Sequence, residues 1–247
     1  MSDEEERDEL FAGGPLRSGS FRFDAEVARV FPDMIRRSVP GYAETVELTG
    51  RLARRFATDG TRLYDVGCSL GATLLACARE LAGSDVRLVG IDASGPMLER
   101  CRGRLSEAGL APLPELLCED VRAVRFEPAS FVALNWTLQF LPLAHRDALV
   151  GRLVDALVPG GALVLSEKIV EADADAQALL EALHADFKRA RGYSELEIAG
   201  KRTALEDVLV PETLAAHRAR LEHAGCRVVL CVQRQLNFAT LLGVRAP

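Results

Sequence analysis

The feature that most constrains this chain is a short apolar segment that turns through two glycines into a helical pattern. Residues 63–71 read Leu-Tyr-Asp-Val-Gly-Cys-Ser-Leu-Gly, and residues 72–81 continue with helix-like spacing. A glycine directly after a strand lets the backbone come close to a ligand and adopt conformations that a Cβ would forbid. Because Gly67 and Gly71 stand in that place, the segment predicts a nucleotide-binding βα unit.

Three acidic residues accompany this turn and the ends of the next two apolar runs. Asp65 lies two residues before Gly67, and the turn lacks G-x-G-x-x-G spacing, so a cationic or amine-bearing ligand is favoured over the pyrophosphate of NAD. Asp92, about 20 residues beyond the turn, suits a pair of ribose hydroxyls. Asp120 and the Val121 backbone suit an adenine ring. Each acid alone is more simply a helix N-cap or a solvated strand end. Together they indicate S-adenosylmethionine.

Strand-like and helix-like runs alternate through the middle of the chain. They cover residues 62–66, 71–81, 86–91, 96–107, 115–118, 131–135, 143–157 and 162–170. Apolar strands separated by helices predict parallel pairing with both faces of the sheet covered. Two later runs, residues 226–231 and 238–244, predict a closing antiparallel pair. We therefore expect an α/β, Rossmann-like fold with a seven-stranded, mostly parallel sheet and helices on both faces.

The ends of the chain and one long segment depart from this alternation. Residues 1–20 mix acidic charge with Gly, Pro and Ser, which predicts a flexible acidic tail. A helical pattern over residues 23–37 is interrupted by Pro32. We expect residues 21–247 to form a single domain, with a charged helical insertion between strands five and six over about residues 171–211. Such an insertion could cap a site or form a subunit interface.

The charge of the chain is unevenly distributed. The formal net charge is −6, and residues 3–9 alone carry −5, which leaves a nearly neutral body. That body is a poor match for a phosphate backbone, so no direct nucleic-acid binding is expected. The six cysteines lack CxxC spacing and read as reduced, small apolar residues. The sequence shows no leader in which a charged segment precedes an apolar one. It also shows no apolar run near the roughly 18 residues that a membrane span needs, so we expect a soluble cytoplasmic protein that binds no membrane.

No metal-binding or nucleophilic arrangement stands out. The histidines lack paired ligand spacing, so surface or helix-end positions are expected and no metal site is predicted; they are His145, His184, His217 and His223. Cys68 lies in the glycine turn without an identifiable partner base. Asn135 closes the fourth strand, where it either faces the ligand crevice or forms a turn. Trp136 is expected to pack. Without a side-chain general base, the proton chemistry is left to the reactants.

The placement of the acids resembles the class I S-adenosylmethionine-dependent methyltransferases over residues 62–170, with Ser69 where many members have glycine. A narrower resemblance covers nearly the whole chain and rests mainly on segments outside that common motif. They are residues 30–42, 65–71, 134–141, 160–168 and 186–198. These segments are similar to those of the carboxy-S-adenosyl-L-methionine synthases, a bacterial family once described as tRNA uridine-5-oxyacetate methyltransferases.

The resemblance implies a transferase that converts S-adenosylmethionine and prephenate to carboxy-S-adenosylmethionine and phenylpyruvate. A sulfonium ylide captures the carbon dioxide released as prephenate aromatises, and the hydroxyl group of prephenate serves as the base. The product supplies the donor for 5-oxyacetyl modification of the wobble uridine in certain tRNAs. The family also implies a homodimer. Such a site must exclude water and bind a carboxylate.

By motif position, the resemblance implies nine contacts with the body of the cofactor: Tyr42, Gly67, Cys68, Ser69, Asp92, Ala93, Asp120, Val121 and Asn135. It implies that Arg202 contacts the cofactor and recognises the new carboxylate during catalysis, since a guanidinium meets two oxygens and keeps its charge. Without the resemblance, Arg202 is one of 27 arginines and lies in a charged helical segment, so its side chain is expected to be solvated. Ser69 adds a hydroxyl beside the methionyl part, a hypothesis that full activity of Ser69→Gly would contradict.

Two other functions stay open on the sequence. A conventional S-adenosylmethionine-dependent methyltransferase acting on tRNA or a small molecule would use the same socket, and the neutral body argues only against the RNA acceptor. A non-catalytic S-adenosylmethionine-binding subunit that stabilises a partner is compatible with the missing general base. Turnover with prephenate separates the synthase from both.

Overall fold

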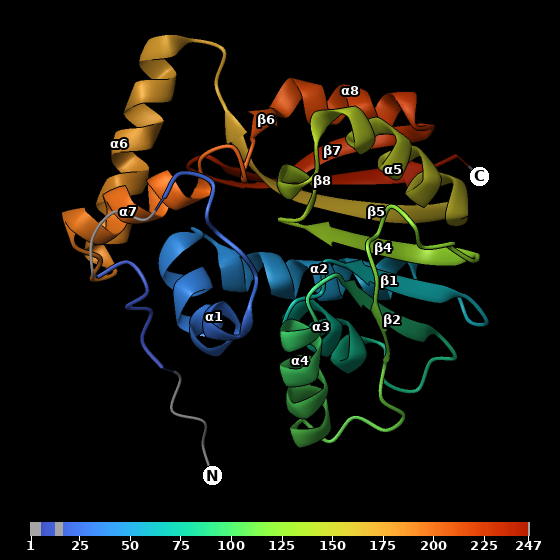
Figure 1. Cartoon of the computed structure of the whole chain (residues 1–247). Coiled ribbons are helices and arrows are strands. Elements are labelled where there is room, and N and C mark those ends of the chain that lie inside the picture. The colour runs from blue at the N-terminus through green and yellow to red at the C-terminus, as the bar shows by residue number, and fades with distance from the viewer. Residues whose placement is uncertain (1–5, 13–16, 247) are drawn as a thin grey trace.

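A computed structural model describes residues 6–12 and 17–246, which form a sheet with helices on both sides (Figure 1). The strands are β1 (Arg62–Val66), β2 (Arg87–Asp92), β3 (Glu115–Cys118), β4 (Ala129–Asn135), β5 (Leu157–Val170), β6 (Glu212–Thr213), β7 (Cys226–Gln235) and β8 (Phe238–Arg245). The helices are α1 (Ala25–Ser38), α2 (Tyr42–Phe56), α3 (Ala72–Glu80), α4 (Gly95–Glu107), α5 (Leu143–Ala156), α6 (Ala174–Ala190), α7 (Glu195–Leu205) and α8 (Leu214–His223), with the 3-10 helix η1 (Leu138–Phe140) before α5.

The strands of the sheet follow the order β3-β2-β1-β4-β5-β8-β7, and β6 pairs with the end of β5. β1 to β5 pair in parallel, whereas β8 runs antiparallel to both β5 and β7. The predicted Rossmann-like α/β sheet with its antiparallel C-terminal pair is confirmed. The predicted count of seven strands is wrong for the described residues, because β6 has only two residues and no periodicity can mark so short a strand.

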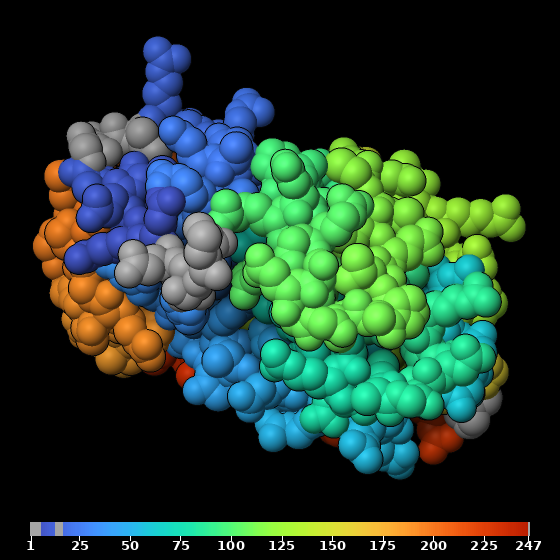
Figure 2. Space-filling model, turned by 90° about the horizontal axis from the view of Figure 1, so that it is seen from below, coloured from blue at the N-terminus to red at the C-terminus, as the bar shows by residue number. Residues whose placement is uncertain are grey.

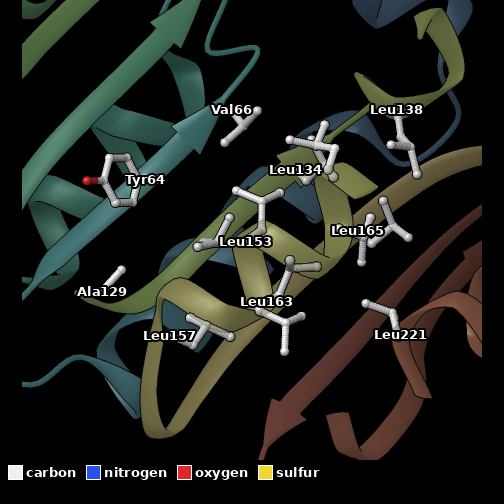
Figure 3. Packing of buried hydrophobic residues seen from close by; sticks show 14 of the residues in the cluster. Tyr64, Val66, Ala129, Leu134, Leu138, Leu153, Leu157, Leu163, Leu165 and Leu221 are labelled. Atoms are coloured by element: carbon white, nitrogen blue, oxygen red, sulfur yellow. The ribbon is translucent and has the colours of Figure 1, made fainter. Parts of the chain in front are cut away.

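Alternation along β4 explains why helices cover both faces. Val132 and Leu134 pack into the cluster formed with α5 and α8, whereas Phe131 and Ala133 pack with α2 and α3. Figure 3 shows the first of these faces, where Leu134 lies among leucines of β5 and α5, including Leu153. Burying one such side chain contributes roughly 1.5–3 kcal/mol. The parallel strands are therefore held from both sides, and their carboxyl ends meet at one edge.

The helix α1 continues through Pro32, so the predicted interruption is wrong. Asp24 caps its start, since Oδ1 accepts from the Val27 backbone N–H at 3.0 Å. The helix ends at Ser38, and Val39 is extended, as expected for a residue that precedes a proline. Although Pro32 removes one donor, the buried face of α1 holds the helix together around Met34.

The N-terminal residues 6–12 belong to the fold. Phe11 packs against α1 and α7, and the buried Asp8 carboxylate accepts a hydrogen bond from Tyr193, which follows the turn between α6 and α7. Figure 2 shows these dark blue residues against the orange surface of the insertion. The prediction of a solvated tail is therefore wrong for Asp8 and Phe11, whose side chains are buried, while residues 1–5 and 13–16 lie outside the described part of the chain.

The predicted insertion is helical and consists of α6 and α7, which gather with α1 at one end of the sheet (Figure 1). Ser194 starts α7 with a reciprocal capping box in which its side chain and that of Glu197 each bond to the other's backbone N–H. The Arg37 guanidinium of α1 donates to the Arg191 carbonyl at 2.8 Å, which ties the insertion to the body. Among the described helices, none is long and apolar enough to cross a membrane.

Arg146 on α5 joins the end of η1 to the segment that follows α7. Its fully buried guanidinium donates to the carbonyls of Leu141 (2.9 Å), Gln139 (3.1 Å) and Val210 (2.9 Å), and pairs with Glu212 at 2.5 Å. A buried charge with this many partners fixes a geometry that an apolar side chain cannot reproduce.

We predict that Arg146→Met lowers the free energy of unfolding by about 3 kcal/mol, because three carbonyl groups lose a charged donor in a buried place. Urea unfolding followed by circular dichroism measures the change. Arg54→Met is the matched control: Arg54 is exposed and 3.7 Å from Glu80, so its loss should cost less than about 0.5 kcal/mol. Equal effects of the two substitutions would contradict the structural role of Arg146.

Candidate active site

A cavity of about 370 Å³ lies at the carboxyl ends of the parallel strands, between the sheet and the layer formed by α1, α6 and α7. This is where open α/β sheets bind ligands. Nine of the ten predicted contact residues line it: Tyr42, Gly67, Cys68, Ser69, Asp92, Ala93, Asp120, Val121 and Asn135. Arg202 does not line it and is exposed on α7, one residue beyond Lys201, which does. The roles of all ten stay predictions.

The glycine turn allows β1 and the loop after β4 to approach each other. Gly67 has φ +75°, and a Cβ on it would lie 1.9 Å from Thr137 Oγ1. The Thr137 hydroxyl lies 3.0 Å from the Val66 carbonyl oxygen and 3.1 Å from that of Asn135, so it joins the two strand ends. Only glycine fits at position 67, for both its conformation and its space.

Asp92 holds the glycine turn in place from the end of β2. Its Oδ2 accepts from the Ser69 N–H at 2.9 Å and its Oδ1 accepts from the Ser94 N–H at 2.8 Å. Burial raises the pKa of Asp92, and these two donors oppose that rise. A carboxylate has about four lone-pair positions. Two are therefore left for the predicted ribose hydroxyls.

Ser69 takes a left-handed conformation, with φ +49°, in which glycine is the usual residue. Its hydroxyl lies 3.5 Å from the Met97 sulfur of α4. The side chain therefore packs beside α4 at the rim of the cavity. To make its predicted contact with the methionyl group of the cofactor, the Ser69 hydroxyl would have to give up its weak contact with Met97.

Two buried oxygens face the cavity without a partner among the described residues: Asp65 Oδ2 and Asn135 Oδ1. The Asn135 amide nitrogen lies 3.4 Å from the hydroxyls of Thr49 and of Thr73, which leaves its oxygen free. Burial, followed by the nearby charge of Asp92, raises the pKa of Asp65 to about 8. Unsatisfied buried acceptors are costly. The pair therefore fits the ammonium or sulfonium charge of S-adenosylmethionine.

Asp120 follows β3, lines the cavity and is exposed. The Arg122 guanidinium donates to both of its oxygens, at 2.5 to 3.0 Å, and this pairing lowers the pKa of Asp120 to about 2. If Asp120 binds an adenine amino group, its carboxylate must accept hydrogen bonds from that group and from Arg122 at the same time. The neighbouring Val121 is buried and lines the same region.

Aromatic side chains form much of the remaining wall. Tyr42 packs on Trp136 with ring centroids 5.1 Å apart, and Phe23 meets Phe140 edge to face at the same separation. Trp136 has φ +53°, a strained conformation held by a 2.6 Å hydrogen bond from its N–H to the Ser166 carbonyl. Trp136 therefore packs as predicted, but it also lines the cavity.

The cavity offers no activated thiol. A hydrogen bond with Cys101, followed by burial, raises the pKa of the Cys68 thiol, so this cysteine stays protonated. All six cysteines are free, as predicted, although Cys118 and Cys231 are exposed. No group of three or more His, Cys, Asp or Glu side chains in the described ranges could hold a metal ion.

The cavity residues that sequence reasoning missed include Lys168, His184, Lys188 and Lys201. The expected surface or helix-end position is wrong for His184 and His217, which are buried. His184 Nε2 lies 2.8 Å from the Ser38 carbonyl, and burial lowers the pKa of His184 to about 3, so the ring is neutral and donates through Nε2. The four-residue spacing of His184 and Lys188 on one helix face was the available signal.

Comparisons with known proteins agree with this geometry. A family profile described as "Methyltransferase domain" matches residues 63–161. A carboxy-S-adenosyl-L-methionine synthase of Shewanella oneidensis is 47% identical over 97% of this chain and 98% of its own length. The chain belongs to the carboxy-S-adenosyl-L-methionine synthase family. A second member, from Stutzerimonas stutzeri, is 49% identical over 96% of this chain and 98% of its own.

A solved structure confirms the fold of this carboxy-S-adenosyl-L-methionine synthase family member. An O-methyltransferase family protein from Burkholderia thailandensis superposes with a TM-score of 0.67 at 17% identity, over 91% of this chain and 61% of the other. The fold of the sheet is therefore that of this solved structure, whereas sequence identity close to half over almost the whole chain is found with the synthase family.

The pKa of Asp65 gives a test of ligand binding at this site. Its pKa of about 8 means that it carries a proton at pH 7, and the raised value destabilises the fold as the pH rises toward 8. A cationic group beside the carboxylate lowers that pKa. We predict that S-adenosylhomocysteine, a probe with the ammonium group, releases nearly one proton at pH 7 and binds roughly tenfold tighter per pH unit between pH 6 and 7.

Calorimetry in buffers of different ionisation enthalpy measures the proton. Asp65→Asn should remove both the release and the pH dependence, and the exposed Asp155→Asn should change neither. Binding of the probe to the wild type without any proton release would show that Asp65 does not titrate on binding.

Proposed function

We propose that this protein converts S-adenosylmethionine and prephenate to carboxy-S-adenosylmethionine, phenylpyruvate and water. The observation that carries the proposal is a cavity with unpaired acidic and amide acceptors at one end, in a chain whose relatives named carboxy-S-adenosyl-L-methionine synthase match it almost end to end. We further propose that the product serves as donor for wobble-uridine modification, and that the enzyme works in the cytoplasm without binding tRNA itself.

The reaction balances without a protein base. A methyl C–H bond of the sulfonium compound breaks, and the proton goes to the hydroxyl of prephenate, which leaves as water. The ring carboxylate of prephenate departs as carbon dioxide, and a C–C bond forms between that carbon and the former methyl carbon. The net charge of the reactants, −1, equals that of the products. The elevated pKa of the Cys68 thiol and the neutral His184 are consistent with this absence of a protein base.

The residues of the cavity have distinct roles in this proposal. Asp65 and Asn135 take the ammonium group of S-adenosylmethionine through their unpaired oxygens, and Asp92 takes the ribose. Tyr42 and Trp136 form an aromatic wall that keeps water from the reacting carbon. A carbanion next to a sulfonium survives only where proton donors are scarce, which favours such an apolar wall.

Arg202 is proposed to recognise the carboxylate of the product. Because it is exposed and outside the cavity lining, it must either turn inward or serve the site of a second copy. We propose a homodimer, for which the exposed Leu179, Leu183 and Leu196 of the insertion offer an apolar surface. Mixing Arg202→Ala with Asp65→Asn subunits decides between the two: activity returns on mixing only if Arg202 acts across the interface.

The decisive experiment incubates the purified protein with S-adenosylmethionine, with and without prephenate, and weighs the products by mass spectrometry. We expect a prephenate-dependent compound that carries the added mass of carbon dioxide, together with equimolar phenylpyruvate. A methylated acceptor without this compound would favour a conventional methyltransferase. Binding without any turnover would favour a non-catalytic subunit.

We predict that Arg202→Ala weakens binding of carboxy-S-adenosylmethionine at least about tenfold and leaves binding of S-adenosylhomocysteine unchanged, because only the former carries the extra carboxylate. Arg202→Lys should recover part of the loss. Isothermal titration measures both ligands, and Arg227→Ala, at an exposed position on β7, is the control. An equal loss for the two ligands would place Arg202 elsewhere than at the carboxylate.

A further inference from the structure

All three lysines of the chain line the same cavity. Lys168 comes from β5, Lys188 from α6 and Lys201 from α7, whereas of the 27 arginines only Arg122 lines it. In the sheet order, β4 separates Lys168 from the strands whose ends carry the acidic residues. The cavity therefore has an acidic end at β1 to β3 and a basic end at β5 and the insertion.

The three lysines differ in their partners. Lys201 is engaged: its ammonium donates to Ser38 Oγ at 2.8 Å and lies 3.5 Å from the Asp8 carboxylate. Lys168 and Lys188 are half-buried, and no side-chain hydrogen bond or ion pair links either of them to the described residues. A partly desolvated ammonium without a carboxylate partner costs free energy. These two lysines therefore fit an anion that comes from outside the chain.

The electrostatics of this end support the same conclusion. Burial, followed by the charges of Lys201, Lys168 and Arg202, lowers the pKa of Lys188 to about 7. Burial and Arg202 also lower the pKa of Lys168, against the opposing charge of Glu181. An anion bound between Lys168 and Lys188 would relieve this repulsion.

An apolar surface adjoins the lysines. Phe238 stands opposite Lys168 in the β5–β8 register, and the neutral His184 ring meets Phe238 edge to face at 5.3 Å. The same cavity continues to Trp136 and Phe140. Its chemistry matches a ligand with a carboxylate at one end and a six-membered carbon ring as its body.

We propose that Lys168 and Lys188 bind the carboxylate that the second substrate retains in the product, an arylpyruvate. This inference rests on the proposed function, which supplies a substrate with two carboxylates. A cation paired with the departing carboxylate would oppose the loss of carbon dioxide, because that group gives up its charge in the transition state. A cation paired with the retained carboxylate holds the substrate without this penalty, and leaves the departing group on the apolar wall beside the methyl donor.

The test uses the full-length protein saturated with S-adenosylhomocysteine and follows the fluorescence of Trp136, the single tryptophan, which lines the cavity. We predict that Lys168→Met and Lys188→Met each weaken the binding of phenylpyruvate and of prephenate by about tenfold. The double substitution should weaken the binding of each compound by about a hundredfold. In turnover, the KM for prephenate rises by the same factor while kcat changes by less than about threefold. Affinity for S-adenosylhomocysteine stays the same.

The controls separate binding from folding. Arg189→Met removes a charge from the same helix outside the cavity lining, where Arg189 pairs with Asp186 and Glu195, and should leave phenylpyruvate binding unchanged. Removal of an unpaired half-buried ammonium should leave the melting temperature unchanged or higher. Lys168→Arg and Lys188→Arg should restore part of the affinity.

The outcomes also separate this inference from the proposed function. A wild type that makes carboxy-S-adenosylmethionine, with lysine variants that bind phenylpyruvate normally, overturns the lysine assignment alone. If the variants bind prephenate more weakly but bind phenylpyruvate normally, the lysines contact the departing carboxylate, and this result also overturns the lysine assignment. A wild type that binds phenylpyruvate through these lysines without any turnover overturns the proposed reaction and supports the site.

Discussion

The close approach of Gly67 to Thr137 is the constraint on which the rest of the site depends. A Cβ at position 67 would occupy the space of the Thr137 hydroxyl, which bridges the carbonyl groups at the ends of β1 and β4. This contact sets where Asn135 and Trp136 leave the sheet. Because Asp92 then ties the glycine turn to the end of β2, three strand ends share one rigid geometry. The acceptors for a cationic ligand are consequently held before any ligand arrives.

Acidic side chains at one end of the cavity and basic side chains at the other fit the proposed reaction between a cation and a dianion. The acidic end carries Asp65, whose Oδ2 has no hydrogen-bond partner among the described residues, and the basic end carries Lys168 and Lys188, whose ammonium groups have none within that part of the chain either. Each end alone is destabilising, since burial disfavours both kinds of charge. In the proposed reaction, a cationic ligand offsets the first cost and an anionic ligand offsets the second, so part of the free energy of binding comes from relieving these unfavourable buried groups.

The sequence brought the residues of the acidic end together in one predicted site and did not bring together those of the basic end, for a physical reason. Parallel strands place their carboxyl ends at one edge, so Asp92 and Asn135 could be brought together from strand order alone. Lys168, Lys188 and Asp8 come from a strand, an insertion and the N-terminus, and only tertiary packing joins such segments. Acidic composition likewise suggested a solvated N-terminus, yet Asp8 is buried because Tyr193 and Lys201 supply its partners. Composition cannot reveal partners that are almost 200 residues away.

Neighbouring residues of β5 couple the two halves of the cavity. Glu167 is buried, and its carboxyl group accepts hydrogen bonds from the backbone N–H groups of Leu138 at 2.8 Å and Gln139 at 3.1 Å, so it holds η1, which begins two residues after Trp136. The next residue, Lys168, donates its own backbone N–H to the Gln139 side chain at 3.1 Å. Since successive residues of a strand point to opposite faces, one residue clamps the loop and the next carries the cation. A displacement of β5 at the lysine would therefore also displace the loop that carries Trp136, which makes substrate recognition and the aromatic wall parts of one unit.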